Sequence, residues 1–194
     1  MSKIIDFYFD FISPYSYIAY KKIKSMQNKN GVDFNYKPIL LGGLHKLGNI
    51  TAPAFNERKM KNMKNDCEII ANKNNISFKW NEKFPINTLY LMRGFISIDA
   101  NKKSEYFDIC FDAYWKNNID ISIEANVNEI LDNCKIDKKK FYTLINDHKI
   151  KDKLKYFTDQ AFELGVFGAP TFIVNNKLFW GQDRLEYALD ECNS

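Results

Sequence analysis

The chain has 194 residues, of which 45% are hydrophobic and 15% aromatic, so it is long enough to bury one core and too apolar to be disordered. Its net charge of +4 is spread over lysine-rich stretches interleaved with Asn, Asp and apolar residues, a pattern that does not indicate a nucleic-acid-binding patch. No apolar run approaches the roughly 18 to 20 residues that cross a bilayer, so we expect neither a nucleic-acid nor a membrane partner.

The first predicted element is a strand over Ile4–Phe9, a short run of β-branched and aromatic residues. Residues 1–10 also carry acidic residues, whereas a signal peptide needs a basic start and a longer apolar run, so we expect a cytoplasmic protein. Ser13 is a good helix N-cap and Pro14 a good first helical residue, which predicts a helix that extends up to Asn28.

Apolar and polar residues alternate in Val32–Tyr36, which predicts a second strand that Pro38 ends. Because a helix separates the two strands, they should form a βαβ crossover and pair in parallel. From Ala54 to Phe162 the apolar residues recur with helical periodicity, with breaks expected at Pro85 and over residues 117–122. We interpret this long stretch as a helical insertion.

The last part of the chain returns to strands. Gly165 is expected to close a helix, and Thr171–Val174 is a β-branched and aromatic run. A turn at Asn175 and Asn176 should connect this strand to Leu178–Trp180 as a hairpin. A final helix is expected to start near Asp183 and to cap the sheet.

The order strand, helix, strand, helical insertion, strand, strand, helix is that of an α/β thioredoxin-like fold interrupted in the middle. It predicts a thioredoxin-like domain from residues 1–53 and 163–194, and an inserted helical subdomain from residues 54–162. Two motifs fall where this fold has its site. Ser13-Pro14-Tyr15-Ser16 occupies the helix start that C-P-x-C holds in disulfide oxidoreductases, and Gly168-Ala169-Pro170-Thr171 resembles the loop whose proline is cis.

The cysteines give no sign of a disulfide framework or a metal site. They are widely separated and form no C-x-x-C or metal-knuckle spacing, and the chain has only two histidines. We interpret them as structural thiols: Cys67, Cys110, Cys134 and Cys192.

Three blocks of sequence together carry a family resemblance. They are D-F-Y-F-D-F-I-S-P-Y-S-Y at residues 6–17, F-P-I-N-T at residues 84–88, and F-G-A-P-T-F at residues 167–172 followed by F-W-G-Q-D-R at residues 179–184. With these blocks the chain resembles the 2-hydroxychromene-2-carboxylate isomerase and kappa-class glutathione transferase family, which has a DsbA-like thioredoxin fold. The resemblance spans nearly the whole chain, and the combination of the first and last blocks is specific.

The resemblance implies that glutathione is a cofactor and that Ser13 hydrogen-bonds its thiol sulfur. A helix N-terminus favours a thiolate, since it offers a partial positive charge and unpaired amides, and a serine hydroxyl can donate one more hydrogen bond. Ser13 is not expected to attack the substrate, because no base lies near it in the sequence. The alternative interpretation of Ser13 is a plain N-cap.

The resemblance also implies a set of binding residues. A cis Ala169-Pro170 bond would leave backbone groups of Ala169 free to pair with the cysteinyl part of glutathione. The γ-glutamyl end would lie near Gly181, Gln182 and Asp183, where a carboxylate suits an ammonium group. For Asp183 the alternative is an N-cap, and for Trp180, which could pack beside glutathione, a place in the core.

Four further polar residues correspond loosely to contacts in the family. Asn49 would bind glutathione, Arg58 or Lys59 would orient a substrate carboxylate, and Asn87 would line the substrate side of the cleft. A solvated Arg58 and a helix-capping Asn87 are the alternatives. Aromatic residues could form an apolar wall or part of the core: Phe11, Tyr15 and Trp80.

The function implied first is a glutathione-dependent isomerase that interconverts 2-hydroxychromene-2-carboxylate and trans-o-hydroxybenzylidenepyruvate or a related aryl pyruvate. A kappa-class-like glutathione transferase and a non-catalytic protein that binds glutathione or a thiol peptide remain alternatives. A disulfide oxidoreductase is disfavoured, because Ser13 and Ser16 stand where its cysteines would be. The family is usually dimeric, so a homodimer is expected.

Overall fold

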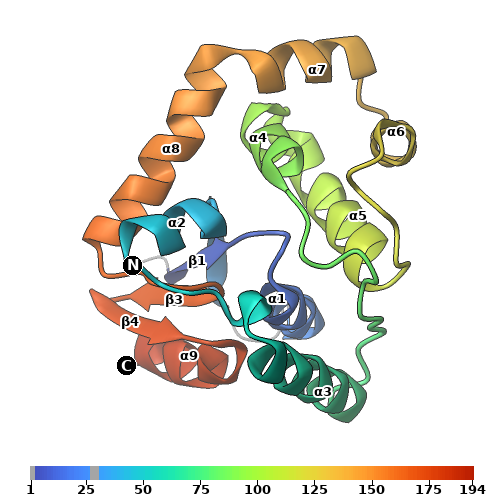
Figure 1. The fold of residues 1–194 in the computed structure, drawn as a ribbon. Coiled ribbons are helices and arrows are strands. Elements are labelled where there is room, and N and C mark those ends of the chain that lie inside the picture. The colour runs from blue at the N-terminus through green and yellow to red at the C-terminus, as the bar shows by residue number, and fades with distance from the viewer. Residues whose placement is uncertain (1–2, 27–30) are drawn as a thin grey trace.

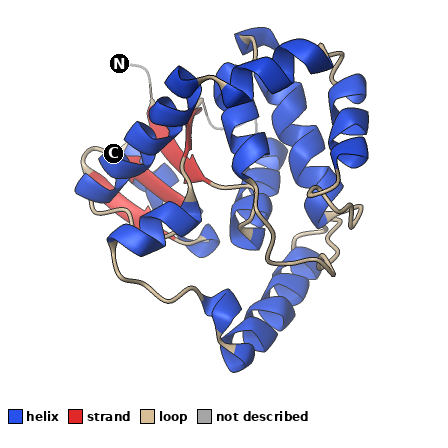
Figure 2. Cartoon of the chain, turned by 45° about the horizontal axis from the view of Figure 1, so that its top comes forward, coloured by secondary structure: helices blue, strands red, loops and turns tan. Residues whose placement is uncertain are grey.

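The computed structural model describes residues 3–26 and 31–194. Its sheet has four strands in the order β2-β1-β3-β4. They are β1 (Ile4–Phe9), β2 (Asp33–Pro38), β3 (Thr171–Val174) and β4 (Lys177–Trp180). β1 pairs in parallel with β2 and antiparallel with β3, and β3 pairs antiparallel with β4, so the sheet is mixed. Figure 2 shows these strands on one side of the molecule and most of the helices on the other.

The predicted βαβ crossover is confirmed. Helix α1 (Pro14–Met26) connects β1 to β2, and the register pairs Ile4 with Asp33 and Phe9 with Pro38. Pro38 is thus the last residue of the strand rather than a residue beyond it. An edge strand tolerates proline at this place because the missing N–H would face away from the sheet. The predicted helix end at Asn28 lies outside the described residues.

The C-terminal hairpin also forms as predicted. Asn175 and Asn176 join β3 to β4 with φ angles of 50° and 60°, as a two-residue turn between twisted strands requires. The expected start of the last helix near Asp183 is shifted, because a 3-10 turn over Gln182–Arg184 (η3) precedes α9 (Leu185–Asn193).

Between β2 and β3 the chain forms seven helices within the described residues. They are α2 (Leu41–Leu47), α3 (Glu57–Lys73), α4 (Leu89–Ser97), α5 (Lys103–Trp115), α6 (Glu124–Asn133), α7 (Lys138–Asn146) and α8 (His148–Glu163), with 3-10 turns at Pro53–Phe55 (η1) and Ala100–Lys102 (η2). No helix of the described residues has both the length and the apolar character to cross a membrane.

Two features of this helical region differ from the prediction. Helix α2 is present although the sequence does not predict it. Residues 74–88 form no helix, although they lie within the stretch for which helical periodicity is predicted. Asn75, with a φ of 53°, and the cis Phe84–Pro85 bond both lie in that segment and are incompatible with a continuous helix. The predicted breaks at Pro85 and residues 117–122 are present, and the division of the chain at residues 53/54 and 162/163 stays a prediction.

Gly165 ends helix α8 as predicted. It lies in the left-handed region with a φ of 83°, where a side chain would be strained. Its N–H donates to the carbonyl of Phe162, and the N–H of Val166 donates to the carbonyl of Ala161, both at 2.9 Å. This pair of bonds is the Schellman arrangement, which satisfies carbonyls that a helix end leaves open.

The sheet buries side chains on both faces, because successive residues of a strand point in opposite directions. Phe7 and Phe9 face a large aromatic cluster that includes residues of α1, α4, α5 and α9. Tyr8, between them, joins a smaller cluster with Leu44 of α2 and Ala161 of α8. Figure 1 shows the corresponding layers, with α2 and α8 above the sheet and α9 below it in that view.

Candidate functional site

Ser13 caps helix α1. Its hydroxyl oxygen accepts a hydrogen bond from the N–H of Ser16 at 3.1 Å, and its carbonyl accepts one from the N–H of Tyr17 at 3.1 Å. The side chain is only 4% exposed. The local sequence explains the position, because serine favours the N-cap and Pro14 has no N–H to leave unpaired at the first helical turn.

The Ser13 hydroxyl also reaches the proline loop. The Ala169–Pro170 bond is cis, and Ser13 Oγ donates a hydrogen bond to the carbonyl of Ala169 at 2.8 Å. The expectation that the backbone groups of Ala169 are free is therefore wrong for the carbonyl, because the serine already occupies it. The N–H of Ala169 has no hydrogen-bond partner in the described parts of the chain, so this donor is open to a ligand.

Ser16, at the position of the second cysteine in the C-P-x-C pattern, is fully buried. Its hydroxyl oxygen has no hydrogen-bond partner within residues 3–26 and 31–194. A buried unpaired hydroxyl costs free energy, so Ser16 contributes less to stability than Ser13 does. Serines thus occupy both positions that carry the redox cysteines of a disulfide oxidoreductase. The hydroxyl of Ser13 forms two hydrogen bonds, and the hydroxyl of Ser16 forms none within the described residues.

The four cysteines stand outside the Ser13–Ser16 motif and are all free thiols. Cys67, Cys110 and Cys134 are buried, and burial raises the pKa of each thiol. A raised pKa keeps a thiol protonated and unreactive. Among the described residues no group of three His, Cys, Asp or Glu side chains could hold a metal ion.

The start of the last helix contacts the proline loop directly. The N–H of Gly181 donates to the carbonyl of Pro170 at 2.9 Å, and Gly181 has a φ of 109°, which only glycine adopts without strain. Gln182 is buried, and its Oε1 accepts a hydrogen bond from Nζ of Lys22 at 2.6 Å. Burial lowers the pKa of Lys22, and the charges of Asp183 and Glu186 oppose this. The side-chain oxygen of Gln182 is therefore already bonded to a lysine of helix α1.

Asp183 differs from its neighbour Gln182. Its side chain is 58% exposed, forms no N-cap bond at this helix start, and lies 3.6 Å from the guanidinium of Arg184. The capping alternative is therefore not observed. The carboxylate faces solvent and is available to a cationic ligand group.

Trp180 is not part of the core. It is 52% exposed, and its ring packs on Phe167 with centroids 4.8 Å apart. A Cβ atom at Gly168 would come within 2.5 Å of Nε1 of Trp180, so only glycine there lets the indole lie across the proline loop. These two rings form an exposed apolar surface next to Pro170.

The other predicted site residues are exposed. Asn49 lies beyond the end of α2 with a φ of 51°, and Arg58 and Lys59 lie in the first turn of α3. Asn87 caps the first turn of α4, because its Oδ1 accepts from the N–H of Leu89 at 2.8 Å. Within the described residues no hydrogen bond or ion pair connects any of these side chains to Ser13. Phe11 is buried in the aromatic cluster, and Tyr15 and Trp80 pack against it, which supports the core interpretation.

One residue at this site was missed by the sequence interpretation. Asp10 follows β1, is only 1% exposed, and accepts hydrogen bonds from the N–H of Ile12, the N–H of Leu41 and the hydroxyl of Thr88. Burial raises the pKa of the Asp10 carboxyl, and these three bonds oppose the increase. The available signal was an acidic residue directly after an apolar strand and three residues before Ser13.

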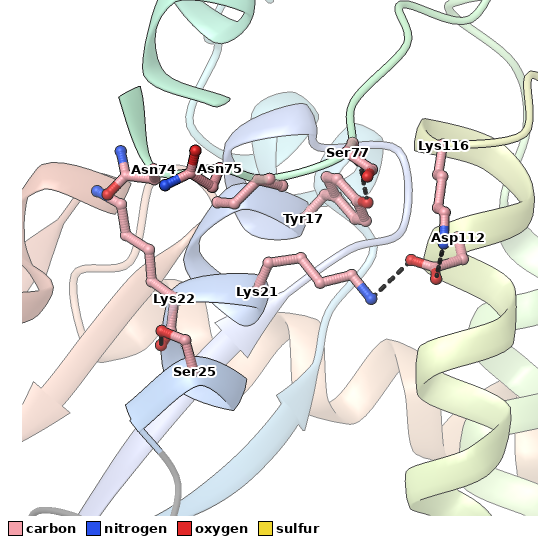
Figure 3. Close-up of a pocket in the computed structure, with 10 residues that line it drawn as sticks. Tyr17, Lys21, Lys22, Ser25, Asn74, Asn75, Ser77, Asp112 and Lys116 are labelled. Atoms are coloured by element: carbon pink, nitrogen blue, oxygen red, sulfur yellow. Dashed lines mark hydrogen bonds and ion pairs between the residues drawn. The ribbon is translucent and has the colours of Figure 1, made fainter. Parts of the chain in front are cut away.

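A polar cavity lies elsewhere, on the outer side of α1. Its volume is about 290 Å³, and neither Ser13 nor the proline loop is part of its wall. Its wall is formed by Tyr17, Lys21, Lys22, Ser25, Asn74, Asn75, Ile76, Ser77, Asp112 and Lys116. Figure 3 shows Lys21 and Lys116 both pointing toward Asp112.

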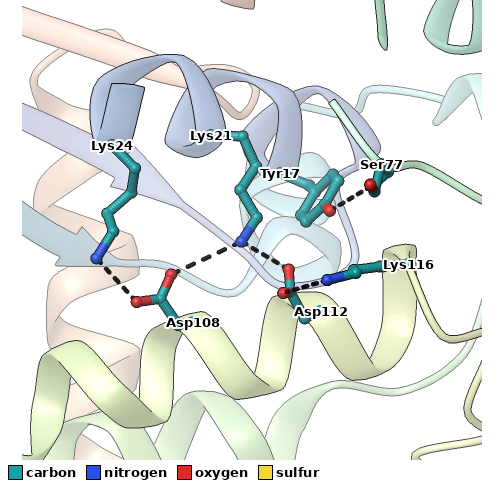
Figure 4. Close-up of polar contacts among 7 residues, drawn as sticks. All are labelled: Tyr17, Lys21, Lys24, Ser77, Asp108, Asp112 and Lys116. Carbon is teal, nitrogen blue, oxygen red and sulfur yellow. Dashed lines mark hydrogen bonds and ion pairs between the residues drawn. The ribbon is translucent and has the colours of Figure 1, made fainter. Parts of the chain in front are cut away.

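Two lysines of this wall, Lys21 and Lys116, belong to a network of ion pairs (Figure 4). Lys21 lies 2.6 Å from Asp112 and 3.7 Å from Asp108, and Lys24 lies 2.9 Å from Asp108. Lys116 lies 3.6 Å from Asp112. Beside it, the hydroxyl of Tyr17 donates to the carbonyl of Ser77 at 2.6 Å. The network connects α1 to α5, and no side chain of the proline loop takes part in it.

Comparison with known proteins agrees with this fold. Residues 4–192 match the model of the DSBA-like thioredoxin domain. The chain is 29% identical to 2-hydroxychromene-2-carboxylate isomerase of Sphingobium xenophagum over 96% of each sequence. A solved structure of such an isomerase superposes with a TM-score of 0.86 at 26% identity, covering 95% of this chain and 91% of that one.

A relative whose name gives a different activity also matches nearly the whole chain. Human glutathione S-transferase kappa 1 is 20% identical, covering 96% of this chain and 89% of that one. Both kinds of relative and the family model span the strands of the sheet together with the helical region between them. The chain therefore belongs to the family of DSBA-like thioredoxin domains.

Proposed function

We propose that the protein is a glutathione-dependent isomerase that interconverts 2-hydroxychromene-2-carboxylate and trans-o-hydroxybenzylidenepyruvate or a related aryl pyruvate. The observation that carries the proposal is the contact of Ser13 Oγ, at the start of α1, with the carbonyl of Ala169 before the cis proline. The similarity to named isomerases over nearly the whole chain supports the choice of reaction.

The residues around Ser13 fit a peptide thiol. The open N–H of Ala169 can pair with the cysteinyl backbone, and the start of α1 provides the positive end of a helix dipole. Bound glutathione would supply a thiolate nucleophile, and its addition to and later loss from the conjugated alkene, with the electron pair taken up by the conjugated carbonyl, would allow rotation about that bond. Asp183 is suited to the ammonium of the γ-glutamyl group, since its carboxylate is exposed.

Ser13 has one hydroxyl proton for two acceptors. It now donates that proton to Ala169, so it must rotate away from that carbonyl in order to donate to a thiolate sulfur. The cap bond from the N–H of Ser16 uses an oxygen lone pair and can persist in both states. Ser13 therefore holds the thiolate without abstracting a proton from the substrate.

The substrate carboxylate is assigned to Arg58 or Lys59, and the far side of the cleft to Asn87. Arg58 and Lys59 form no ion pair within the described residues, so their charges are available to an anion. Asn87 keeps its amide nitrogen free while its oxygen caps α4. Together these groups would orient the substrate relative to the thiolate.

The deciding experiment measures isomerisation with and without glutathione, together with calorimetric titration of glutathione. We expect isomerisation only when glutathione is present, and a dissociation constant that rises about tenfold or more in Asp183→Asn, because a charge-assisted hydrogen bond is lost. Ser13→Ala should raise the pKa of the bound thiol, measured by thiolate absorbance. Isomerisation at full rate without glutathione would contradict the proposal.

A kappa-class-like transferase is the second candidate, favoured by the human relative that spans 96% of this chain. Both functions would use the same residues. Incubation with glutathione and a chloronitrobenzene separates them, because a transferase forms a conjugate and an isomerase does not. Binding of glutathione without either reaction would leave the non-catalytic alternative.

We also propose a homodimer, since exposed aromatic side chains of the helical region such as Phe55 and Tyr156 would otherwise contact water. Light scattering at micromolar concentration should give twice the mass of the 22.8 kDa chain. The mass of a single chain would contradict this.

A further inference from the structure

Asp10 is the most buried carboxylate next to the site and has no cationic partner among the described residues. Its Oδ1 accepts from the N–H of Ile12 at 3.1 Å and from the hydroxyl of Thr88 at 2.6 Å. Its Oδ2 accepts from the N–H of Leu41 at 2.8 Å. A buried carboxylate is retained only where its lone pairs are satisfied, and here hydrogen bonds alone satisfy them.

The three donors come from three segments that are far apart in the sequence. Ile12 directly precedes Ser13, and the backbone carbonyl of Asp10 accepts from the N–H of Ser13 at 3.0 Å. Leu41 is the first residue of α2, and Thr88 is the N-cap of α4. The side chain of Asp10 thus connects residues 10–13, called here the serine turn, to α2, which precedes Asn49, and to the start of α4, which follows Asn87.

The backbone groups of Phe11, which lies between Asp10 and Ser13, also bond to side chains of the helical region. The N–H of Phe11 donates to Sδ of Met92 at 3.5 Å, and the carbonyl of Phe11 accepts from Nε1 of Trp115 at 2.8 Å. Met92 lies one helical turn beyond Thr88. The position of Ser13 is therefore fixed relative to α4 by contacts on either side of the turn.

We propose that Asp10 is a positioning residue, which sets the distance between Ser13 and the start of α4 so that glutathione and substrate meet in one geometry. This rests on the proposed function, since it assigns glutathione to the Ser13 side and the substrate to the Asn87 side. Asp10 contacts neither molecule in this scheme and acts through Ser13 and Thr88.

Thr88 offers the sharpest test, because its hydroxyl makes no cap bond to α4. Its cap function resides in the backbone carbonyl, which accepts from the N–H of Met92 at 2.9 Å and survives substitution. Thr88→Val keeps the shape and removes only the bond to Asp10. Thr88→Ser keeps the hydroxyl. The pair separates the bond to Asp10 from the packing of the side chain.

We expect Thr88→Val to lower kcat for isomerisation about tenfold, the effect of some 1.4 kcal/mol in the transition state, while the dissociation constant of glutathione changes less than twofold. Thr88→Ser should restore kcat to within about threefold of the natural protein. Asp10→Asn should behave like Thr88→Val, because an amide has a single oxygen and its NH2 group would face one of the donors that now bond to the carboxylate. Asp6→Asn is the matched control, since Asp6 lies on β1, the strand that Asp10 follows, and is only partly buried.

Equal kcat values for the natural protein and Thr88→Val would overturn the proposal, as would equal losses in Thr88→Val and Thr88→Ser. Parallel changes in kcat and glutathione affinity would assign Asp10 to glutathione binding instead. Amide hydrogen exchange, measured without ligands, keeps the test independent of the proposed function. Thr88→Val should accelerate exchange at Ile12, Ser13 and Leu41, even if the natural protein proves to have no isomerase activity.

Discussion

Helix α1 has polar contacts at its N-terminal end and on its outer face, and the two sets differ in kind. At the N-terminal end Asp10 and Ser13 are at most 4% exposed, and their side chains form hydrogen bonds to uncharged groups. On the outer face Lys21 and Lys24 meet Asp108 and Asp112 with side chains that are 21% to 33% exposed, and the carboxylates are shared among lysines. Buried hydrogen bonds should therefore be sensitive to single substitutions, and partly exposed ion pairs that share a carboxylate should not.

The largest difference is expected between the two serines of the α1 motif. Ser13→Ala removes a cap and leaves the buried carbonyl of Ala169 unpaired, so it should lower the free energy of unfolding by about 2 to 3 kcal/mol. Ser16→Ala removes a hydroxyl without a partner in the described residues and should change stability by less than about 0.5 kcal/mol. Urea unfolding measures both, and equal losses would break the comparison.

A second expectation concerns alkaline pH. Burial, and to a smaller extent the charge of Asp6, raise the pKa of Tyr8 to about 12, whereas an unfolded tyrosine titrates near 10. The folded state then holds a proton that the unfolded state loses, so the stability that Tyr8 contributes is complete below about pH 10 and lost as pH rises toward 12. Tyr8→Phe should flatten the fall in stability over this range. An unchanged profile would exclude Tyr8 as its source.

A smaller effect is expected at Lys22 of α1. This lysine bonds to the buried Gln182 in the 3-10 turn η3, so Lys22→Met should lower the free energy of unfolding by about 1 kcal/mol, measured in urea. Gln182→Glu is the matched variant, because it would place a carboxylate opposite the ammonium group. Loss of stability in Gln182→Glu would show that burial outweighs charge pairing there.

The smallest effect is expected on the outer face. Asp112→Asn should cost less than about 1 kcal/mol, because Lys21 keeps Asp108 within ion-pair distance. The loss should disappear in 1 M salt, where the screening length is about 3 Å. A loss as large as that of Ser13→Ala would mean that the outer network is as sensitive as the N-terminal end.

The sequence predicts those parts of the molecule that depend on neighbours in the chain. The βαβ crossover, the asparagine hairpin, the glycine stop of α8 and the serine cap of α1 all follow from local patterns. The contacts that define the site join residues far apart: Ser13 and Ala169 are separated by 156 positions, and Asp10 and Thr88 by 78. Such partners cannot be inferred from a residue pattern alone, so neither the occupied carbonyl of Ala169 nor the bonds of Asp10 were foreseen.

The left-handed turns of the chain have a consequence for protein engineering. Six non-glycine residues of the described parts have positive φ, and five are asparagine: Asn49, Asn75, Asn118, Asn175 and Asn176, with Lys135 as the sixth. Asparagine tolerates this backbone conformation better than most residues, yet glycine carries no penalty there. Glycine at positions 75, 135 and 176, whose side chains form no hydrogen bond within the described residues, should therefore give small gains in stability, whereas Asn118 and Asn175 also hold hydrogen bonds to Glu82 and Glu191.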